Sequence, residues 1–533
     1  MERANDTPRN QVTVQSSFRV RPLTVMLALA GAGIVLFLFL WRLDTYPAPW
    51  FDEGAYMNVA KTLVEDGVYG EKSSEGYRFN GAVISTGPTV ILPIAVMYSL
   101  FGVGVLPARL IMTVYGVLTL VMVFLLARRL IADWRFALVA AALLLLSWGN
   151  WMPLVFRTVM GEGPGAFFVL AALWLWFVPK PGLFRLIGVG LLLALAAMTK
   201  TQYALIIFPS LAIAFLLELI WYRKAGWRSF VVPGLVAALV FGAWLLVAYV
   251  LLGTGLRDQT ADATTAGATA SLSYFTLDLN SIANNLLALA TGQAYAGLFL
   301  VALLGGAGLS LPRTVDGQRW GILTSLIVVG LFFYLIMTGV SPDHNRMAVP
   351  VYVLGSLVVA RLLYALLDRF RFSWSEFPAA LRSGDLSNRA LLLPLLAMGL
   401  AITLLVLPLL RAGYNVVFSG NDLPYQAAAY LNQHAPPDAL IETWDREMAI
   451  LTPHVYHFPP QSTQAVHNAH VANPALPTAG DVYPLLDLVT PDYIVIGPMS
   501  RWAELYPPSV LSHYVSVFQA GEAAGAYEVF ARR

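Results

Sequence analysis

Long apolar runs recur along this chain of 533 residues, and they limit what it can fold into. A helix that crosses a bilayer needs about 20 mostly apolar residues. Hydrophobic residues make up 58% of the chain and charged residues only 12%, which is far less charge than a soluble globular protein carries. The sequence therefore predicts an α-helical polytopic membrane protein. About eleven runs qualify as transmembrane helices, and they are 23–41, 106–127, 135–150, 163–178, 184–199, 203–221, 229–252, 295–311, 320–339, 347–366 and 391–410.

The distribution of lysine and arginine orients these helices, because cytoplasmic segments carry the excess of positive charge. The run 90–102 is too short to span, and we expect it to lie in the interface or to re-enter. With that run not crossing, every basic segment falls on the cytoplasmic side; if it crossed, Arg128 and Arg129 would face outward. The basic segments are the N-terminal tail, the turns 128–135, 180–185, 223–228 and 313–319, and the segment 367–390.

The composition changes near Tyr414 to that of a soluble domain. Residues 423–434 have helical spacing, 493–497 are typical of a buried strand, and 514–518 with 526–530 are expected to pair as a hairpin. The sequence thus predicts a small extracytoplasmic α/β domain. The expected domains are a cytoplasmic tail at 1–22, a transmembrane domain at 23–411 with an outer loop at 42–105, and the soluble domain at 412–533.

Charge and cysteine content exclude several classes of function. A net charge of +2 is too small to indicate nucleic-acid binding. The absence of cysteine excludes a disulfide framework, a thiolate nucleophile and a cysteine-ligated metal. The first apolar run is too long for a cleavable signal peptide and has no small-residue cleavage site, so it predicts a retained helix and a cytoplasmic N-terminus.

Two adjacent acids, Asp52 and Glu53, follow the first span in the segment 50–56 (WFDEGAY), which also holds Tyr56. Carboxylates beside a bilayer are costly unless they face water and have a task. At an apolar boundary a carboxylate can act as a general base toward a hydroxyl or amine. The alternative is that one acid caps the helix that starts at Ala55, and the two interpretations are compatible.

Cationic residues lie on the same predicted side of the membrane. Arg346, with His344 beside it, is a candidate for holding a phosphate through a bidentate fork. The alternative is an arginine that extends to the lipid headgroups. Lys200 contradicts the cytoplasmic bias of basic residues, and it is either a phosphate contact or an interfacial anchor.

Arg157 and Glu162 form a further candidate pair. Arg157 could pair with Glu162 or Asp52, or it could contact a substrate phosphate. Glu162 precedes an apolar helix, which also fits simple capping. Six of the seven histidines lie in the soluble domain, but their spacing is a weak metal signal, so no metal site is predicted. The sequence still leaves a divalent cation open as a cofactor, because carboxylates beside a phosphate can bind one.

The ordered series of these segments resembles the protein O-mannosyltransferase superfamily, which also contains the lipid A aminoarabinose transferases and has the glycosyltransferase C fold. The resemblance covers roughly residues 23–350. It rests on Asp52 to Leu63 with Gly67, Gly87 to Val90, Phe101-Gly102, Ala108-Arg109-Leu110, Ala127 to Leu130, Arg157 with Glu162, Thr199-Lys200, and Arg346 with Pro350.

That resemblance implies a bacterial membrane glycosyltransferase. The enzyme would move a single sugar from a polyprenyl-phosphate donor to a lipid, glycan or protein acceptor on the extracytoplasmic face, with inversion. Asp52 would be the base and Glu53 would support it, while Arg157, Lys200 and Arg346 would be candidates for the donor phosphate. The family's Pro-Pro-Leu is Gly87-Pro88-Thr89 here and its Arg-Tyr is Arg346-Met347, which leaves the sugar and acceptor open.

Two other classes of function compete with the transferase. A transporter or flippase of lipid-linked sugars predicts charges near the bilayer centre and matching broken helices in two halves. A non-catalytic membrane scaffold predicts an outer domain that binds a partner. The notable charges gather at one face and no repeat is visible, which favours the transferase.

Overall fold

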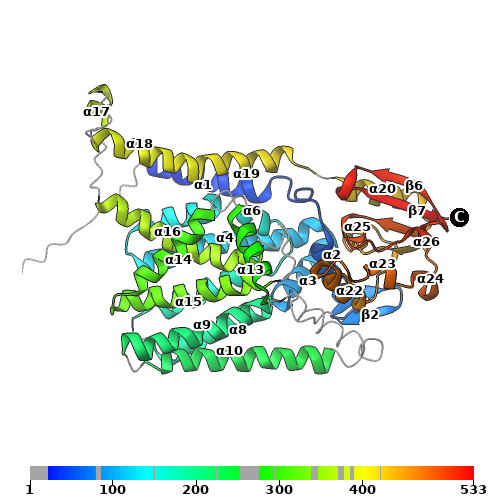
Figure 1. Ribbon diagram of the computed structural model, residues 1–533, viewed down its shortest axis with the longest axis horizontal. Coiled ribbons are helices and arrows are strands. Elements are labelled where there is room, and N and C mark those ends of the chain that lie inside the picture. The colour runs from blue at the N-terminus through cyan, green and yellow to red at the C-terminus, as the bar shows by residue number, and fades with distance from the viewer. Residues whose placement is uncertain are drawn as a thin grey trace, which may run out of the picture.

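A helical bundle and a C-terminal unit of mixed strands and helices lie end to end (Figure 1). Between them lie α2 (Phe51–Asp66), α3 (Pro88–Phe101) and a short hairpin. The computed structural model describes residues 22–79, 86–147, 151–179, 181–223, 226–252, 275, 277–291, 296–337, 346–369, 377–383, 389–420 and 422–533.

The helices of the bundle follow the apolar runs of the sequence. Six helical stretches are long and apolar enough to cross a membrane, and shorter apolar helices accompany them in the described residues. The chain is an integral multi-pass membrane protein; the number of about eleven spans and their orientation stay predictions. The main helices are α1 (Pro22–Leu40), α4 (Val105–Leu130), α5 (Trp134–Ala142), α7 (Glu162–Trp176), α8 (Leu183–Thr199), α9 (Gln202–Leu217), α10 (Arg228–Leu246), α13 (Leu279–Thr291), α14 (Ala296–Ser310), α15 (Val315–Leu335), α16 (Val349–Arg369), α18 (Arg389–Ala401) and α19 (Leu407–Phe418).

The last helical run extends further than the sequence suggested. A π-helical turn, Ile402–Val406, joins α18 to α19, which continues to Phe418. The boundary expected at residue 412 therefore lies inside a helix. Its end is fixed to the loop after α1, because the Arg42 guanidinium donates to the Val417 carbonyl at 2.7 Å.

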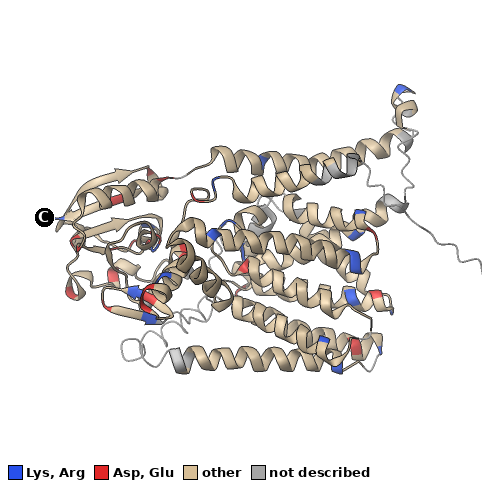
Figure 2. Ribbon diagram, turned by 180° about the vertical axis from the view of Figure 1, so that it is seen from behind, with Lys and Arg blue, Asp and Glu red and all other residues tan. Residues whose placement is uncertain are grey.

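Lysine and arginine residues gather at the end of the bundle remote from the C-terminal unit (Figure 2). Arg129 stacks on Trp174 at 4.4 Å from the ring centroid, and Arg319 donates to the Phe177 carbonyl at 2.9 Å. Both contacts lie near the end of α7. At the opposite end, where α7 begins, acidic and basic residues occur together.

The segment between α1 and α4 covers this mixed end. It contains α2 (Phe51–Asp66), an antiparallel hairpin of β1 (Gly70–Ser73) and β2 (Gly76–Phe79), and α3 (Pro88–Phe101). A left-handed Gly67 ends α2, with φ at 72°. Leading into α3, Gly87 donates its N–H to the Thr199 carbonyl at 2.8 Å, which ties the segment to the turn between α8 and α9.

The C-terminal unit is built on a five-stranded sheet of order β4-β3-β5-β7-β6. Strands β4, β3 and β5 are parallel, and β5, β7 and β6 are antiparallel, so the hairpin expected at 514–530 is confirmed. Its elements are α20 (Leu423–His434), β3 (Leu440–Glu442), α21 (Met448–Leu451), β4 (Val455–His457), α22 (Gln461–Ala472), α23 (Ala479–Val482), α24 (Leu485–Leu488), β5 (Tyr493–Ile496), α25 (Pro498–Trp502), α26 (Pro508–Leu511), β6 (Tyr514–Ala520) and β7 (Tyr527–Arg532).

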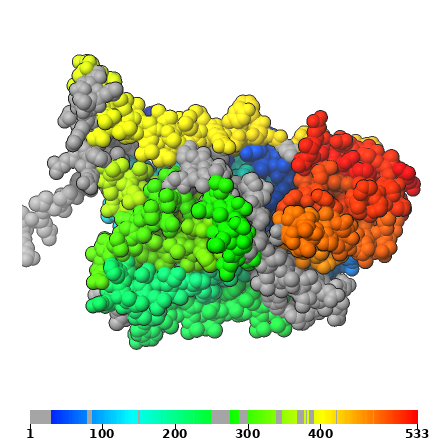
Figure 3. All heavy atoms as spheres, in the orientation of Figure 1, coloured from blue at the N-terminus to red at the C-terminus, as the bar shows by residue number. Residues whose placement is uncertain are grey.

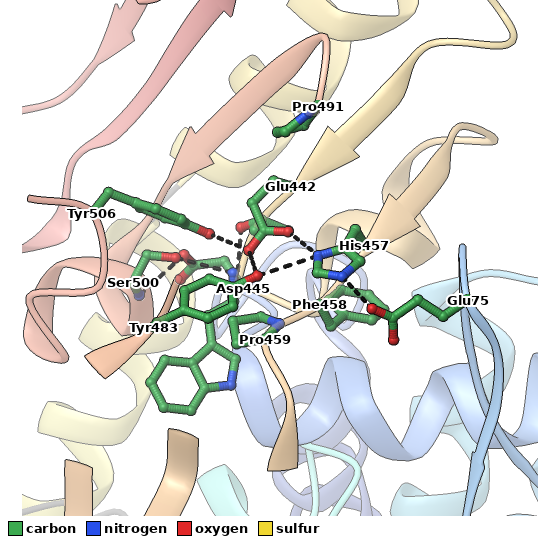
Figure 4. A network of polar contacts seen from close by, with 12 residues as sticks. Glu75, Glu442, Asp445, His457, Phe458, Pro459, Tyr483, Pro491, Ser500 and Tyr506 are labelled. Atoms are coloured by element: carbon green, nitrogen blue, oxygen red, sulfur yellow. Dashed lines mark hydrogen bonds and ion pairs between the residues drawn. The ribbon is translucent and has the colours of Figure 1, made fainter. Parts of the chain in front are cut away.

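A buried polar network joins this sheet to the β1–β2 turn (Figure 4). Glu442 accepts from the hydroxyls of Tyr483 at 3.0 Å and Tyr506 at 3.1 Å, and it bonds to His457 Nδ1. His457 Nε2 lies 2.6 Å from Glu75 Oε1. Burial disfavours the charged form of His457, but Glu442 and Glu75 outweigh it and raise the pKa of the imidazole.

Further contacts seat the C-terminal unit on the segment between α1 and α4. The Arg78 guanidinium donates to the carbonyls of Pro459 at 2.7 Å and Phe458 at 2.6 Å. The Lys61 ammonium donates to the Ala449 carbonyl at 2.9 Å. In the space-filling view the orange and red atoms of this unit lie directly against blue atoms from the early part of the chain (Figure 3). The unit therefore packs over the end where α2 begins.

Candidate functional site

Asp52 and Arg346 meet at the boundary between the bundle and the segment that joins α1 to α4. Asp52 lies in the first turn of α2, and Arg346 lies in the short turn that leads into α16. Arg346 Nη2 is 2.5 Å from Asp52 Oδ2, and its guanidinium also lies 4.7 Å from the ring centroid of Trp50. The side chain of Asp52 is 21% exposed and that of Arg346 is 12% exposed, so solvent reaches this pair.

A second ion pair lies directly behind the first. Lys200 Nζ is 2.5 Å from Glu162 Oε1, and these side chains are 2% and 0% exposed. Arg346 Nε lies 3.5 Å from the same Glu162 oxygen, so Arg346 bridges both carboxylates. The result is an alternating row of charges, Asp52–Arg346–Glu162–Lys200, which we call the charge row.

Local structure explains why the row forms. Glu162 is in the first turn of α7, and Lys200 is an extended residue between α8 and α9 that pairs with Thr86 as an isolated β-bridge. The Tyr203 hydroxyl donates to the Glu162 carbonyl and fixes the start of α7. Helix starts and turns from four separate segments thus converge at one end of the bundle.

Glu53 has a different environment from its neighbour Asp52. Its carboxylate forms a bidentate pair with Arg109, at 2.8 Å from Nε and 2.6 Å from Nη2, and it accepts from the Val159 N–H at 3.0 Å. Both charged side chains are 0% exposed. The Arg109 Nη1 also donates to the Leu43 carbonyl at 2.9 Å. Glu53 therefore anchors α2 to α4.

Arg157 does not pair with Glu162 or Asp52, the partners considered from sequence. Among the described residues its guanidinium donates to backbone carbonyls, including Leu38 at 2.8 Å, Trp41 at 2.6 Å and Tyr46 at 2.7 Å. It is fully buried, and all three of its nitrogens are used. This geometry makes Arg157 the clamp of the loop after α1, because every nitrogen of its guanidinium donates to the backbone there. Its role as a phosphate contact stays a prediction.

Tyr56 lies one turn after Asp52 on α2 and is buried. Burial raises the pKa of its hydroxyl, and the charges of Asp52 and Glu162 raise it further, while Arg346 opposes them. Tyr56 is thus a neutral hydroxyl beside the charge row. The remaining candidate, His344, lies outside the described residues.

Two arginines of the site region were missed as functional candidates from sequence. Arg109 was noted only as part of the Ala108-Arg109-Leu110 segment, although an arginine inside an apolar helix is itself a signal of a buried partner. Arg446 lies in the C-terminal unit, pairs with Glu71 at 2.7 Å, and stacks on Phe51. No local pattern marks Arg446, because its partners lie hundreds of positions earlier in the chain.

The described residues contain no group of three histidine, cysteine or acidic side chains placed to hold a metal ion. A small apolar pocket lies beside the inner end of the charge row, between α7, α9, α15 and α16. Its lining includes Ala166, Val169, Tyr203, Leu326 and Pro350. Tyr203 joins the two features, because its ring lines the pocket and its hydroxyl contacts Glu162.

The geometry gives the site two chemical abilities. A solvent-accessible carboxylate can accept a proton, and the adjacent guanidinium and ammonium can stabilise an anion that develops nearby. Both abilities lie at the end of a membrane-embedded bundle, with an apolar pocket behind them. The charges are not near the middle of the helices, where a transport path would need them.

Comparison with known proteins identifies the fold. No protein-family model and no curated protein sequence matches the chain. Among solved structures, ArnT from Cupriavidus metallidurans bound to undecaprenyl phosphate matches with a TM-score of 0.62 and 15% identity, over 95% of this chain and 98% of that one. The archaeal oligosaccharyltransferase AglB from Archaeoglobus fulgidus, in complex with an inhibitory peptide and a dolichol-phosphate, matches with a TM-score of 0.56 and 14% identity, over 96% of this chain and 74% of that one.

Both of these structures have the glycosyltransferase C fold. The chain therefore has this fold, as the resemblance in its sequence implied. The match to ArnT spans nearly the whole of both chains, so it includes the bundle and the C-terminal unit together.

Proposed function

We propose that this protein is a membrane glycosyltransferase that moves a single sugar from a polyprenyl-phosphate donor to an acceptor on the extracytoplasmic face. The observation that carries the proposal is the partly exposed Asp52–Arg346 pair backed by the buried Glu162–Lys200 pair. The fold supports it, since ArnT is bound to undecaprenyl phosphate and AglB to a dolichol-phosphate in structures of the same fold.

In the proposed reaction Asp52 is the general base. It accepts the proton of the acceptor hydroxyl or amine as that group attacks the anomeric carbon. The bond from the anomeric carbon to the phosphate oxygen breaks, and the electron pair leaves with the lipid phosphate. A single displacement of this kind inverts the anomeric centre.

Arg346 and Lys200 are proposed to stabilise the departing phosphate. Arg346 is the member of the charge row that solvent reaches besides Asp52, and its planar fork suits two phosphate oxygens. Lys200 is buried behind it and places a second positive charge on the far side of Glu162. Glu53 is proposed to act only by positioning, because its carboxylate is occupied by Arg109.

The test uses the full-length protein, purified in detergent, with a panel of polyprenyl-phosphate sugars and measurement of released lipid phosphate. We expect turnover with one donor class, and a loss of about 10²- to 10⁴-fold in Asp52→Asn, the usual contribution of a general base. Asp66→Asn is the matched control, since Asp66 ends the same helix and pairs with Lys72 at 2.9 Å away from the charge row.

Two outcomes would contradict the proposal. Full turnover by Asp52→Asn would require a different base. No turnover with any donor, combined with movement of the lipid-linked sugar across proteoliposomes, would identify a flippase instead.

A further inference from the structure

The turn that follows β3 in the C-terminal unit packs directly on the first turn of α2. A Cβ added at Gly54 would lie 2.1 Å from the backbone nitrogen of Glu447 and 2.5 Å from the carbonyl carbon of Arg446. No side chain fits at such distances, so the two backbones are in contact. Gly54 comes two residues after Asp52, so the contact lies beside the proposed base.

The Arg446 side chain contacts the same segment on the other side of Asp52. Its guanidinium lies 5.0 Å from the ring centroid of Phe51, which immediately precedes Asp52. Phe458 lies against the guanidinium as well, at 5.6 Å, and Glu71 pairs with it at 2.7 Å. Arg446 and its backbone thus hold both ends of the segment 51–54.

The turn itself is rigidly fixed to the sheet. The Asp445 carboxylate accepts from the N–H groups of Gly497 at 2.8 Å, Met499 at 2.8 Å and Ser500 at 3.2 Å. Glu447 accepts from the hydroxyl of Tyr527 on β7. A turn anchored on both sides of Arg446 gives that side chain little freedom, so its hold on α2 is firm.

Arg446 also retains an unused hydrogen-bond donor in a buried place. Its Nε is buried and makes no hydrogen bond in the described part of the chain. Its pKa is lowered by burial; Glu71 opposes this, Arg78 lowers the pKa further, and Asp52 and Tyr56 favour the charged form. Because Arg446 stacks on Phe51, the residue before Asp52, its positive charge lies beside Asp52 on the side of the C-terminal unit.

We propose that Arg446 is a positioning residue for Asp52, through which the C-terminal unit completes the catalytic site. The proposal rests on the proposed function of Asp52 as base. Arg446 fixes the first turn of α2, and its charge adds to that of Arg346 in keeping the carboxylate ionised. The bundle alone would hold Asp52 on one side only.

The other charged and titratable groups around Asp52 set the background for this effect. Arg346 pairs with it directly from the α16 side, and Glu162 with Lys200 lie behind Arg346 from α7 and the α8–α9 turn. Tyr56 lies on α2 itself, while Glu53 is turned to Arg109. Arg446 is thus a second cation on a separate element.

The test measures kcat, KM and the pH profile of Arg446→Met and Arg446→Lys against wild type. We expect Arg446→Met to lower kcat by about tenfold or more with little change in the donor KM, because a misplaced base loses transition-state interactions. We also expect the acid limb of the profile to move to higher pH by about half a unit, since a cation near the carboxylate is lost. Arg446→Lys should restore the acid limb but only part of kcat.

Arg532→Met is the matched control, because Arg532 forms an ion pair with Asp492 on the exposed face of the same unit, 3.0 Å apart. An unchanged acid limb and kcat in Arg446→Met, with only lowered thermal stability, would overturn the proposal.

A readout that needs no turnover separates this proposal from the proposed function. Hydrogen exchange by mass spectrometry should show faster exchange in the segment 51–58 of Arg446→Met, with exchange in β6 and β7 unchanged. Unchanged exchange in that segment would refute the positioning role whether or not the protein is a transferase. If wild type shows no turnover but Arg446→Met still shows this faster exchange, only the proposed reaction is overturned.

Discussion

Asp52 and Glu53 are adjacent in sequence, yet the structure predicts opposite effects when each loses its charge. Glu53 and Arg109 are both 0% exposed and form a bidentate pair. Removing one partner of a buried pair leaves an uncompensated charge and costs about 3 to 5 kcal/mol. Glu53→Gln should therefore lower Tm by roughly 8 °C, at about 2 °C per kcal/mol.

Asp52→Asn should leave Tm almost unchanged. Its carboxylate is partly exposed, and Arg346 keeps Glu162 as a second partner at 3.5 Å, so the substitution leaves no buried charge without a partner. Turnover should nevertheless fall by about 10²- to 10⁴-fold, because the proposed base is lost. One substitution thus affects chemistry and the neighbouring one affects stability.

The assay compares thermal unfolding and lipid-phosphate release for the two variants in the same detergent. The double variant Glu53→Gln with Arg109→Met should recover part of the lost Tm, since it removes the unpaired guanidinium. A Tm for Glu53→Gln within about 1 °C of wild type, or a double variant no more stable than the single one, would refute this reasoning.

Three further predictions concern the contacts that hold the site. Gly54→Ala should loosen the C-terminal unit from α2, because the added methyl group overpacks against Glu447 and costs about 1 to 3 kcal/mol of stability. The cost is measured as a lower Tm, and a Tm equal to wild type would show that the two backbones separate freely. The stability that His457 contributes should be fully present below a pH of about 6.5 and lost as the pH rises through its raised folded-state pKa. In thermal unfolding between pH of about 6 and 9, Tm should therefore fall with rising pH in wild type but not in His457→Gln. The same fall in the variant would exclude this imidazole as its source. Arg157→Met should destabilise the protein strongly without altering the donor KM of the folded fraction, and a selective rise in KM would instead identify Arg157 as a phosphate contact.

Most of the bundle could be predicted from sequence because a membrane helix is a local feature that needs only a long apolar run. The C-terminal helix at 423–434 and the hairpin near its end were equally local. The β1–β2 hairpin at 70–79 was not foreseen. Its four-residue strands carry no clear alternation, and contacts with β4 and Arg446 support them instead.

The candidate site was predictable in its chemistry but not in its pairings. Sequence placed Asp52, Lys200 and Arg346 on one side of the membrane, and the structure brings these three side chains into one row with Glu162. The sequence could not show that Arg157 donates to backbone carbonyls, because every residue has a carbonyl and no residue type marks those that accept. Roles for these residues in catalysis stay predictions until variants are measured.

The charge row has equal numbers of positive and negative members, and this balance weakens its long-range attraction for an anionic ligand. Two carboxylates and two cations within contact distance produce a field that fades over a few ångströms. Such a site does little to attract an anion from bulk solution, and added salt should change its association rate only slightly. A ligand that diffuses laterally within the bilayer needs no long-range attraction, because its search is confined to two dimensions.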